Sequence, residues 1–448
     1  MKRLMVPLYF VLGLLVAPQI VTAAALTGEV VSEADQGLPA RVTAYNAETR
    51  QAVVTYTTPL GKFCLQAPDG PLRVWASHGP EWTIAEQSVA ADGPRELRFV
   101  LRRLVDMPAR GYYGADLHMH STASDGKQSP TEVAYACRAE GLEVAALTDH
   151  WQARGHTEWL AQKAADFLPL GGQECSTGMG HIVGVNTTEG IQRPDPISAA
   201  GILDIFRQIH AQGGFAILAH PNVPGMNYQA PEVTGYDAME IMNGSIAPYG
   251  PVFDMLQART SWHCMLSQGC RVPVVGDSDN HDVLNGTGRR VLLGSTELQK
   301  IDRRLALLSR LLDFEKTLAP WAWKTHSGAY RTYLQLEATT PDAVQAAVKA
   351  GRGFVTNGPL LLATLDGKGP GSDVVVGERQ SLTLKAEMLA NRPLDKLVVI
   401  VNGAPAATMQ SNSAEMQVSV PVKAGDWVTA ELYGEWPEFA TTNAWYVK

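Results

Sequence analysis

The sequence is poor in cysteine and in charged residues and has no basic excess, and each shortage excludes a class of protein. Five cysteines in 448 residues do not make the disulfide framework of small secreted domains, and the odd number leaves at least one unpaired in the chain. A formal net charge of −8 and a pI near 5.8 argue against non-specific nucleic-acid binding, which needs a basic surface. With 45% hydrophobic and 18% charged residues, we expect a globular chain of two or three domains.

The cysteines also give no clear disulfide. Cys264 and Cys270 are near enough in sequence to pair, but "WHCMLSQGC" (262–270) reads partly helical, which makes the pairing geometry doubtful. Cys175 has no stronger explanation than packing. The sequence carries no signal of oligomeric state.

Long apolar runs are absent after the first 25 residues. Lys2 and Arg3 precede an apolar stretch from Leu4 to about Ala17, and the small residues "VTAAA" (21–25) follow. This order predicts a signal peptide over residues 1–25, cleaved near Ala24, and hence a periplasmic or secreted protein. The alternative is an uncleaved membrane anchor. No later run reaches the roughly 18 apolar residues of a membrane span, so we expect no stable membrane insertion of the mature protein.

Composition and periodicity divide the remainder into three domains. Residues 26–107 contain short strand-like runs separated by Gly, Pro and Asp, which predicts a β-sandwich. This part resembles the carboxypeptidase-regulatory-like module, with Gly28 opening a strand. Residues 108–358 alternate short apolar strands with helices, which favours βα units and a largely parallel sheet. Residues 359–448 are strand-like again and predict a second β-sandwich.

Two helices have clear start signals. "SPTEVAYACRAEG" (129–141) places Ser129 at the N-cap, Pro130 at the first helical position and Glu132 where it completes a capping box. "TPDAVQAAVKAGRG" (340–353) repeats the pattern with Thr340 and Pro341. A further helix is expected over 300–325.

Histidine is scarce as well, yet two histidines stand one residue apart in "DLHMHSTASDG" (116–126). In a strand, alternate side chains point to the same face, so His118 and His120 project together and Asp125 returns from the following loop. Two imidazoles and a carboxylate suit a divalent cation such as zinc, manganese or iron. Alone the pattern is weak, because short HxH matches occur by chance.

More candidate ligands end the other expected strands, at the edge where barrel active sites form. The full set has six histidines and three carboxylates: His118, His120, Asp125, His150, Glu174, His181, His220, Asp279 and His281. One zinc takes about four ligands, so this set indicates two or three metal ions with Glu174 as the central bridge. One histidine at a strand end is more often a hydrogen-bonded neighbour than a ligand, but chance explains the whole set poorly. The other five histidines are expected to be structural.

The ordered motifs HxHxxxxD, TDH, GxE, H, AHP and DxH resemble the polymerase and histidinol phosphatase (PHP) family. They resemble most its exported CehA/McbA-type (carbaryl-hydrolase-like) branch. The resemblance covers residues 111 to about 300 and returns at "GRGFVTNGP" (351–359). It implies a distorted (β/α)7 barrel with a di- or trinuclear metal centre, ligand roles for the nine residues above, and a supporting role for Asp277. Amidohydrolase barrels also begin with HxH, but the carboxylate at the bridging position favours the PHP resemblance.

The function expected from this set is metal-dependent hydrolysis of a small-molecule ester, in which Glu174 and Asp279 act at the metals. The sequence contains no GxSxG nucleophile motif and no GxxxxGK[ST] phosphate loop. Three hypotheses stay open: a phosphoesterase, a carboxyl-ester, amide or carbamate hydrolase, and a non-enzymatic exported binding module. A phosphoesterase usually adds a cation, for which Arg352 is the first candidate, with Arg289 and Arg290 as alternatives.

Overall fold

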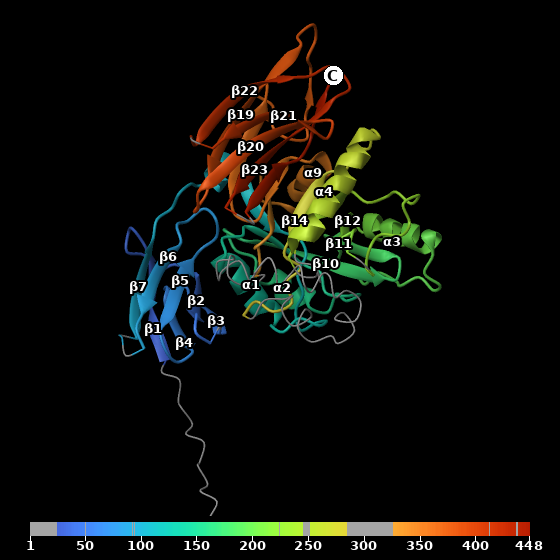
Figure 1. Cartoon of the computed structure of the whole chain (residues 1–448). Coiled ribbons are helices and arrows are strands. Elements are labelled where there is room, and N and C mark those ends of the chain that lie inside the picture. Colours follow the sequence, from blue (N-terminus) through green and yellow to red (C-terminus); the bar gives the residue numbers. More distant parts are fainter. Residues whose placement is uncertain are drawn as a thin grey trace, which may run out of the picture.

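The computed structural model describes residues 25–448 except 50, 92, 94, 224, 245–250, 285–325, 412 and 436–437. The predicted helix at 300–325, Arg289, Arg290 and all but the last residue of the predicted signal peptide lie outside the described residues. Figure 1 shows three regions, with the N-terminal strands at one side, the central strands and helices beside them, and the C-terminal strands above. Among the described residues, no helix combines the length and apolar character needed to cross a membrane.

The N-terminal region has two sheets that pack on a common core. One sheet has the order β4-β1-β7 and the other β3-β2-β5-β6. The bounds are β1 Ala25–Ser32, β2 Arg41–Asn46, β3 Gln51–Tyr56, β4 Lys62–Gln66, β5 Leu72–Ser77, β6 Ala85–Val89 and β7 Glu96–Leu101. In β7, Leu97, Phe99 and Leu101 alternate into the core between the sheets. Gly28 is required where β1 passes β7, because a Cβ there would lie 1.9 Å from the Leu97 carbonyl oxygen.

The central region follows the order β14-β13-β12-β11-β10-β9-β8. Its strands are β8 Tyr112–Asp116, β9 Val144–Leu147, β10 Leu168–Thr177, β11 Gly180–Val185, β12 Phe215–Ala219, β13 Ala238–Asn243 and β14 Val274–Asp277. Its helices are α1 Pro130–Ala139, α2 His156–Leu160, α3 Ala199–Ala211 and α4 Pro251–Ser267. The capping box of α1 is present, with Ser129 accepting from the Glu132 N–H and the Glu132 carboxylate accepting from the Ser129 N–H.

The sheet is less parallel than the sequence suggested. β8, β9 and β10 run parallel, as do β12, β13 and β14, but β11 is antiparallel to both of its neighbours. The reason is local: only Gly178 and Met179 separate β10 from β11, which is enough for a hairpin but not for the crossover helix that a parallel pair needs.

The two ends of this strand series meet just beyond β8 and β14. Met119 and Asn280 form a parallel bridge, the His120 N–H donates to the Asn280 carbonyl at 2.9 Å, and the Asp279 N–H donates to the His118 carbonyl at 2.8 Å. Within the described residues the sheet itself continues from β8 into β15. A closed (β/α)7 barrel therefore stays a prediction, while the curl brings the β8 and β14 ends to one place.

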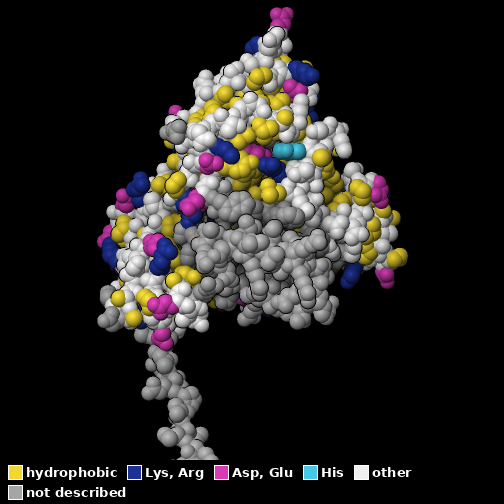
Figure 2. All heavy atoms as spheres, in the orientation of Figure 1, with side chains coloured by type: hydrophobic (Ala, Val, Ile, Leu, Met, Phe, Trp, Pro, Cys, Tyr) yellow, Lys and Arg dark blue, Asp and Glu magenta, His cyan; other side chains and the backbone are white. Residues whose placement is uncertain are grey.

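The C-terminal region shares the large sheet. From β8 the sheet continues through β15, β16, β24, β23, β20 and β21, and the facing sheet has the order β17-β19-β22. The bounds are β15 Arg331–Gln335, α9 Pro341–Ala350, β16 Gly353–Thr356, β17 Leu360–Leu365, β18 Asp373–Val374, β19 Ser381–Leu389, β20 Leu394–Val401, β21 Ala404–Gln410, β22 Glu415–Pro421, β23 Trp427–Gly434, β24 Phe439–Thr442 and β25 Trp445–Val447. The boundary predicted between residues 358 and 359 falls within this continuous sheet, because β16 pairs with β24. On the face shown in Figure 2, acidic and basic side chains are interspersed.

Candidate metal centre

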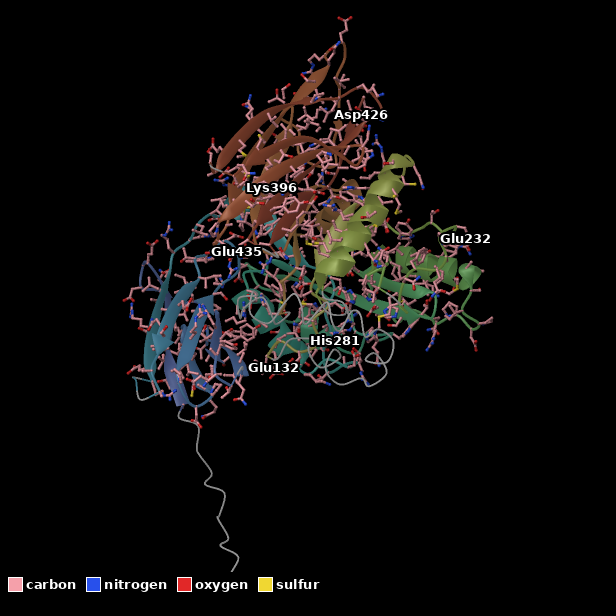
Figure 3. The ribbon with its side chains drawn as sticks, in the orientation of Figure 1. Glu132, Glu232, His281, Lys396, Asp426 and Glu435 are labelled. Carbon is pink, nitrogen blue, oxygen red and sulfur yellow. The ribbon has the colours of Figure 1, made fainter. Side chains whose placement is uncertain are left out.

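The strand ends bring all nine predicted ligands together. His118 and His120 follow β8, and His150 follows β9. Glu174 lies in β10 and His181 in β11, the two strands of one hairpin, where Glu174 pairs with Val183 and His181 with Ser176. His220 follows β12, and Asp279 and His281 follow β14. In Figure 3, His281 is labelled in the central region.

The nine residues form three overlapping donor groups, in each of which the donor atoms all lie within 4.8 Å of one another. The first group is His118, His120, Glu174 and Asp279; the second is His120, Asp125, His150 and His281; the third is Glu174, His181 and His220. His120 joins the first group to the second, and Glu174 joins the first to the third. Overlap of this kind suits neighbouring metal ions with shared ligands.

Glu174 occupies the middle of the cluster. Its Oε2 lies 3.3 Å from Nε2 of both His118 and His120 and 3.0 Å from Nδ1 of His150. Its Oε1 lies 2.6 Å from Nδ1 of His181 and 3.3 Å from Nε2 of His220. The two oxygens of one buried carboxylate thus face imidazoles on different sides, as a bridging ligand must.

The carboxylates of Asp279 and Asp125 differ in solvent exposure. Asp279 is fully buried, and its Oδ1 is 3.4 Å from His118 Nε2 and 3.1 Å from His120 Nε2. Asp125 is exposed, and its oxygens are 3.6 Å from His150 Nε2 and 3.4 Å from His281 Nε2. The second donor group is therefore the most exposed of the three.

Several buried polar atoms in the cluster have no hydrogen-bond partner, which bears on whether metal ions fit there. Nε2 of His118, both ring nitrogens of His120 and Oδ1 of Asp279 are buried and make no hydrogen bond. Nε2 of His118 and Nε2 of His120 lie 3.4 and 3.1 Å from Oδ1 of Asp279 but make no hydrogen bond to it. Such atoms are costly to bury unpaired. Because imidazole nitrogens and carboxylate oxygens are ligands for zinc, manganese and iron, this donor set fits divalent ions.

The charges within the cluster agree with this fit. Burial would lower the pKa of His118, but Asp279, Glu240 and Glu174 together raise it well above its usual value. Burial also opposes the charge on His150, yet Asp125 and Glu174 raise its pKa to about 10. Burial disfavours the charged form of Glu174, but the surrounding imidazoles, His118 first, bring its pKa well below normal. The raised pKa values of His118 and His150 favour their protonated forms in the metal-free protein, and a divalent ion would displace those protons.

Sequence reasoning missed Glu240, which orients a ligand. Its Oε1 is 2.7 Å from Nδ1 of His118, and its Oε2 accepts from the His220 N–H at 2.7 Å. Holding Nδ1 of His118 in this way turns Nε2 toward the cluster. The sequence did offer a signal for this role: Glu240 is an acidic residue within the mostly apolar strand segment "AMEIMN" (238–243), where a charge needs a partner.

Asp149 and Asp116 were missed as well. Asp149 accepts from the Ser121 and Ser124 N–H groups at 2.8 and 3.1 Å and so shapes the loop that presents Asp125. Asp116 accepts from the Ser278 N–H at 3.1 Å, and burial raises its pKa to about 6. Both flank predicted ligands in the sequence, which was a usable signal.

Asp277 lies behind the donor groups and belongs to none of them. Its Oδ1 accepts from the Leu117 N–H at 2.6 Å. Burial, reinforced by Glu240 and Asp116, raises its pKa well above normal. This placement agrees with the supporting role expected for it.

The structure does not bring Arg352 to the cluster. Its carbonyl accepts from the Gln335 N–H at 2.9 Å, and Gln335 pairs with Tyr112, the first residue of β8. His118 lies two residues past the other end of that strand. The glycines beside Arg352 suggested a close approach to the site, but the strand direction places it at the opposite edge of the sheet.

The five remaining histidines lie outside the donor groups, as expected. Each has a partner elsewhere: His78 the Ala139 carbonyl, His156 the Gly172 carbonyl, His210 Asp237, His263 Glu431, and His326 Arg41.

Comparison with known proteins finds similarity over limited stretches of the chain. No protein-family model matches the chain. The chain is 47% identical over 76 residues to the 5'-3' exoribonuclease of Haemophilus influenzae, covering 16% of this chain and 28% of that protein. It is 41% identical over 95 residues to the 3',5'-nucleoside bisphosphate phosphatase of Chromobacterium violaceum, covering 20% and 32%. The chain thus spans less than a third of the length of either relative.

A solved structure and a third relative cover larger shares. A two-domain protein from Bacteroides vulgatus, described as containing a predicted PHP-like metal-dependent phosphoesterase, is 18% identical with a TM-score of 0.39, covering 72% of this chain and 91% of that one. The uncharacterized protein MJ1587 of Methanocaldococcus jannaschii is 31% identical over 122 residues, covering 25% of this chain and 68% of that protein. The chain therefore belongs to the same family as the Methanocaldococcus jannaschii protein.

Proposed function

We propose that the chain is an exported metal-dependent phosphoesterase of the PHP kind, within its CehA/McbA-type branch. The observation that carries the proposal is the convergence of nine donor side chains around the buried carboxylate of Glu174. The names of the two relatives with more than 40% local identity, an exoribonuclease and a bisphosphate phosphatase, support phosphoester chemistry.

The buried and the exposed candidate ligands would have different roles. Bound divalent ions supply a hydroxide near neutral pH and polarise the scissile group. His118, His120, Glu174 and Asp279, all buried, would fix the positions of the ions and keep bulk water from the inner side. Asp125, with 58% of its side chain exposed, and His150, with 27%, would hold the outer ion where a small-molecule ester enters.

A carboxyl-ester, amide or carbamate hydrolase is the second candidate. It is favoured by the position of Arg352, because the first candidate for the phosphate-binding cation lies away from the donor groups; the alternatives Arg289 and Arg290 lie outside the described residues. The same metal centre would serve either reaction, because both require an activated water and a polarised oxygen.

Metal analysis combined with a substrate panel tests the proposal. Purified protein is expected to hold two or three zinc, manganese or iron ions per chain and to hydrolyse phosphate mono- or diesters. Glu174→Gln should lose metal and lower kcat by more than about 100-fold, beyond the range seen for residues that only orient ligands. His210→Gln, which changes a histidine outside the donor groups, is the matched control and should retain both.

Other results of the metal analysis and the substrate panel would favour a different function. Cleavage of carboxyl esters or carbamates alone would replace the first function with the second. Metal binding with no hydrolysis of any ester would favour the binding module, and full activity in metal-free protein would refute the metal hypothesis.

Export is proposed from the basic, apolar and small-residue order of residues 1–25. N-terminal sequencing of protein secreted by its native cell should find a start near Ala24 to Leu26. An intact Met1 would contradict cleavage.

A further inference from the structure

Trp151 directly follows the ligand His150 and adopts an unusual backbone conformation. Its φ of 51° lies in the left-handed region, where a bulky side chain is disfavoured. Two of the other non-glycine residues with positive φ are the candidate ligands His220 and Asp279. Strain of this kind gathers at functional sites, where the surrounding structure enforces it. No role in metal binding accounts for the indole.

Hydrogen bonds fix the indole to the backbone that presents the metal ligands. Its Nε1 donates to the Ser176 carbonyl at 3.2 Å, while Oγ of Ser176 lies 2.5 Å from Nδ1 of His150. The Trp151 N–H donates to the Glu174 carbonyl at 3.1 Å. A shift of the ring would therefore be felt by two ligands, so the ring position is well defined relative to the metal centre.

Two more apolar side chains border the same part of the site. Met179 lies in the hairpin turn just before His181, and Tyr228 lies in the loop after His220. The Gln229 N–H donates to the Met179 carbonyl at 2.9 Å, which joins the two loops. Met179, Tyr228 and Trp151 are each half-buried and pack against one core cluster. The loops that present three candidate ligands thus each add an apolar group.

A cation completes the arrangement. The exposed Arg193 places its guanidinium over the Trp151 ring, 5.7 Å from the centroid. This cation–π contact helps to hold the plane of the indole. Because the Trp151 side chain is only half-buried, part of it stays open to solvent beside the cation.

We propose that Trp151, held by Arg193, forms a stacking subsite for an aromatic ring on the substrate, such as an aryl group or a nucleobase. The inference rests on the proposed function, because it names the class of ester that the metal centre receives. Flat rings stack on tryptophan regardless of their substituents, so the subsite selects for aromaticity rather than for one base.

Paired substrates with similar leaving groups test the subsite. 2-Phenylethyl phosphate and n-butyl phosphate both release a primary alcohol, but only the first carries a ring. For Trp151→Ala, kcat/KM for the phenylethyl ester should fall at least about tenfold more than for the butyl ester, mainly through KM. Trp151→Phe should keep most of the preference, and Arg193→Met should lose part of it.

Trp82→Ala is the matched control, because Arg103 lies over Trp82 at the same 5.7 Å but in the N-terminal sandwich. It should leave the preference unchanged. Equal losses on both esters with Trp151→Ala would overturn the subsite.

A binding measurement separates this inference from the proposed function. If the wild-type protein hydrolyses no phosphoester, the proposed function fails, and calorimetric binding of adenosine 5'-monophosphate then decides the subsite. A dissociation constant about tenfold weaker in Trp151→Ala supports it, and an unchanged constant refutes it.

Discussion

At the scale of single residues, the candidate metal centre depends on side chains outside the three donor groups. Glu240 illustrates this, since it holds Nδ1 of His118 and the backbone N–H of His220 at once. Glu240→Gln keeps the size but removes the charge, and should weaken metal affinity by about 10–100-fold. Titration of metal-depleted protein with Zn²⁺ measures the change.

A matched variant separates orientation from loss of charge. Glu232 is an exposed acid elsewhere in the central region (Figure 3), so Glu232→Gln should bind zinc as the wild type does. Wild-type affinity in Glu240→Gln would contradict the orienting role.

Protons and metal ions compete for the same histidines. Because neighbouring carboxylates overcome burial and raise the pKa of His150 to about 10, metal must displace protons throughout the neutral range. Apparent affinity should rise with pH up to about 10. In the metal-free protein these charged pairs stabilise the fold fully below the usual histidine pKa of about 6.5, and that contribution is lost as pH rises through 10.

Calorimetry in buffers of different ionisation enthalpy measures the proton release directly. An observed binding enthalpy that does not depend on the buffer at pH 7 would mean that no protons leave, against the charge arrangement described.

Residue identity and spacing singled out the nine residues that the structure brings together, but not the residues that support them. His118, His120 and Asp279 follow strands, and strand ends converge whatever the details of the sheet. Glu240 acts across the sheet on β8, a contact that depends on which strands curl together. Arg352 shows the converse, because its flanking glycines carry no information about strand direction.

At the scale of elements, local signals were reliable where they act locally. The α1 capping box is one such case, with Glu132 Oε2 accepting from the Ser129 N–H at 2.8 Å. Ser129→Ala should lower the free energy of unfolding by about 1 kcal/mol, and Ser129→Asp, which keeps the acceptor, by less. Urea denaturation distinguishes them, and equal stabilities would show that the cap contributes nothing.

The direction of β11 shows where element prediction fails. Alternation of strands and helices favoured parallel pairing, but the turn at Gly178 and Met179 reverses the chain. Apolar strand patterns look alike in parallel and antiparallel sheets when both faces are buried. Only the length of the connection distinguishes them, and here it was two residues.

At the scale of the whole molecule, a buried ion pair joins the N-terminal sandwich to the central region. Arg41 Nε donates to Glu140 Oε1 at 2.6 Å, with both side chains almost fully buried, and Arg41 also contacts His326. Arg41→Met leaves Glu140 buried without its main counter-charge and should cost roughly 3–5 kcal/mol of stability.

Changing both partners reveals the origin of that cost. The double variant Arg41→Met, Glu140→Met should recover most of the stability in thermal unfolding, because no uncompensated charge remains. A double variant as unstable as the single one would show that packing, not charge, joins the two regions.

The shared sheet has a consequence for the order in which the chain is made. β16 belongs to the sheet of the metal centre, yet its partner β24 is synthesised only after the facing sheet β17-β19-β22 is complete. Until Phe439–Thr442 leave the ribosome, one side of β16 presents unpaired backbone N–H and C=O groups, the kind of edge that recruits strands from other chains. The C-terminal strands therefore complete the sheet that carries the candidate metal centre, and a chain released before they are made would expose an unpaired strand edge that favours aggregation.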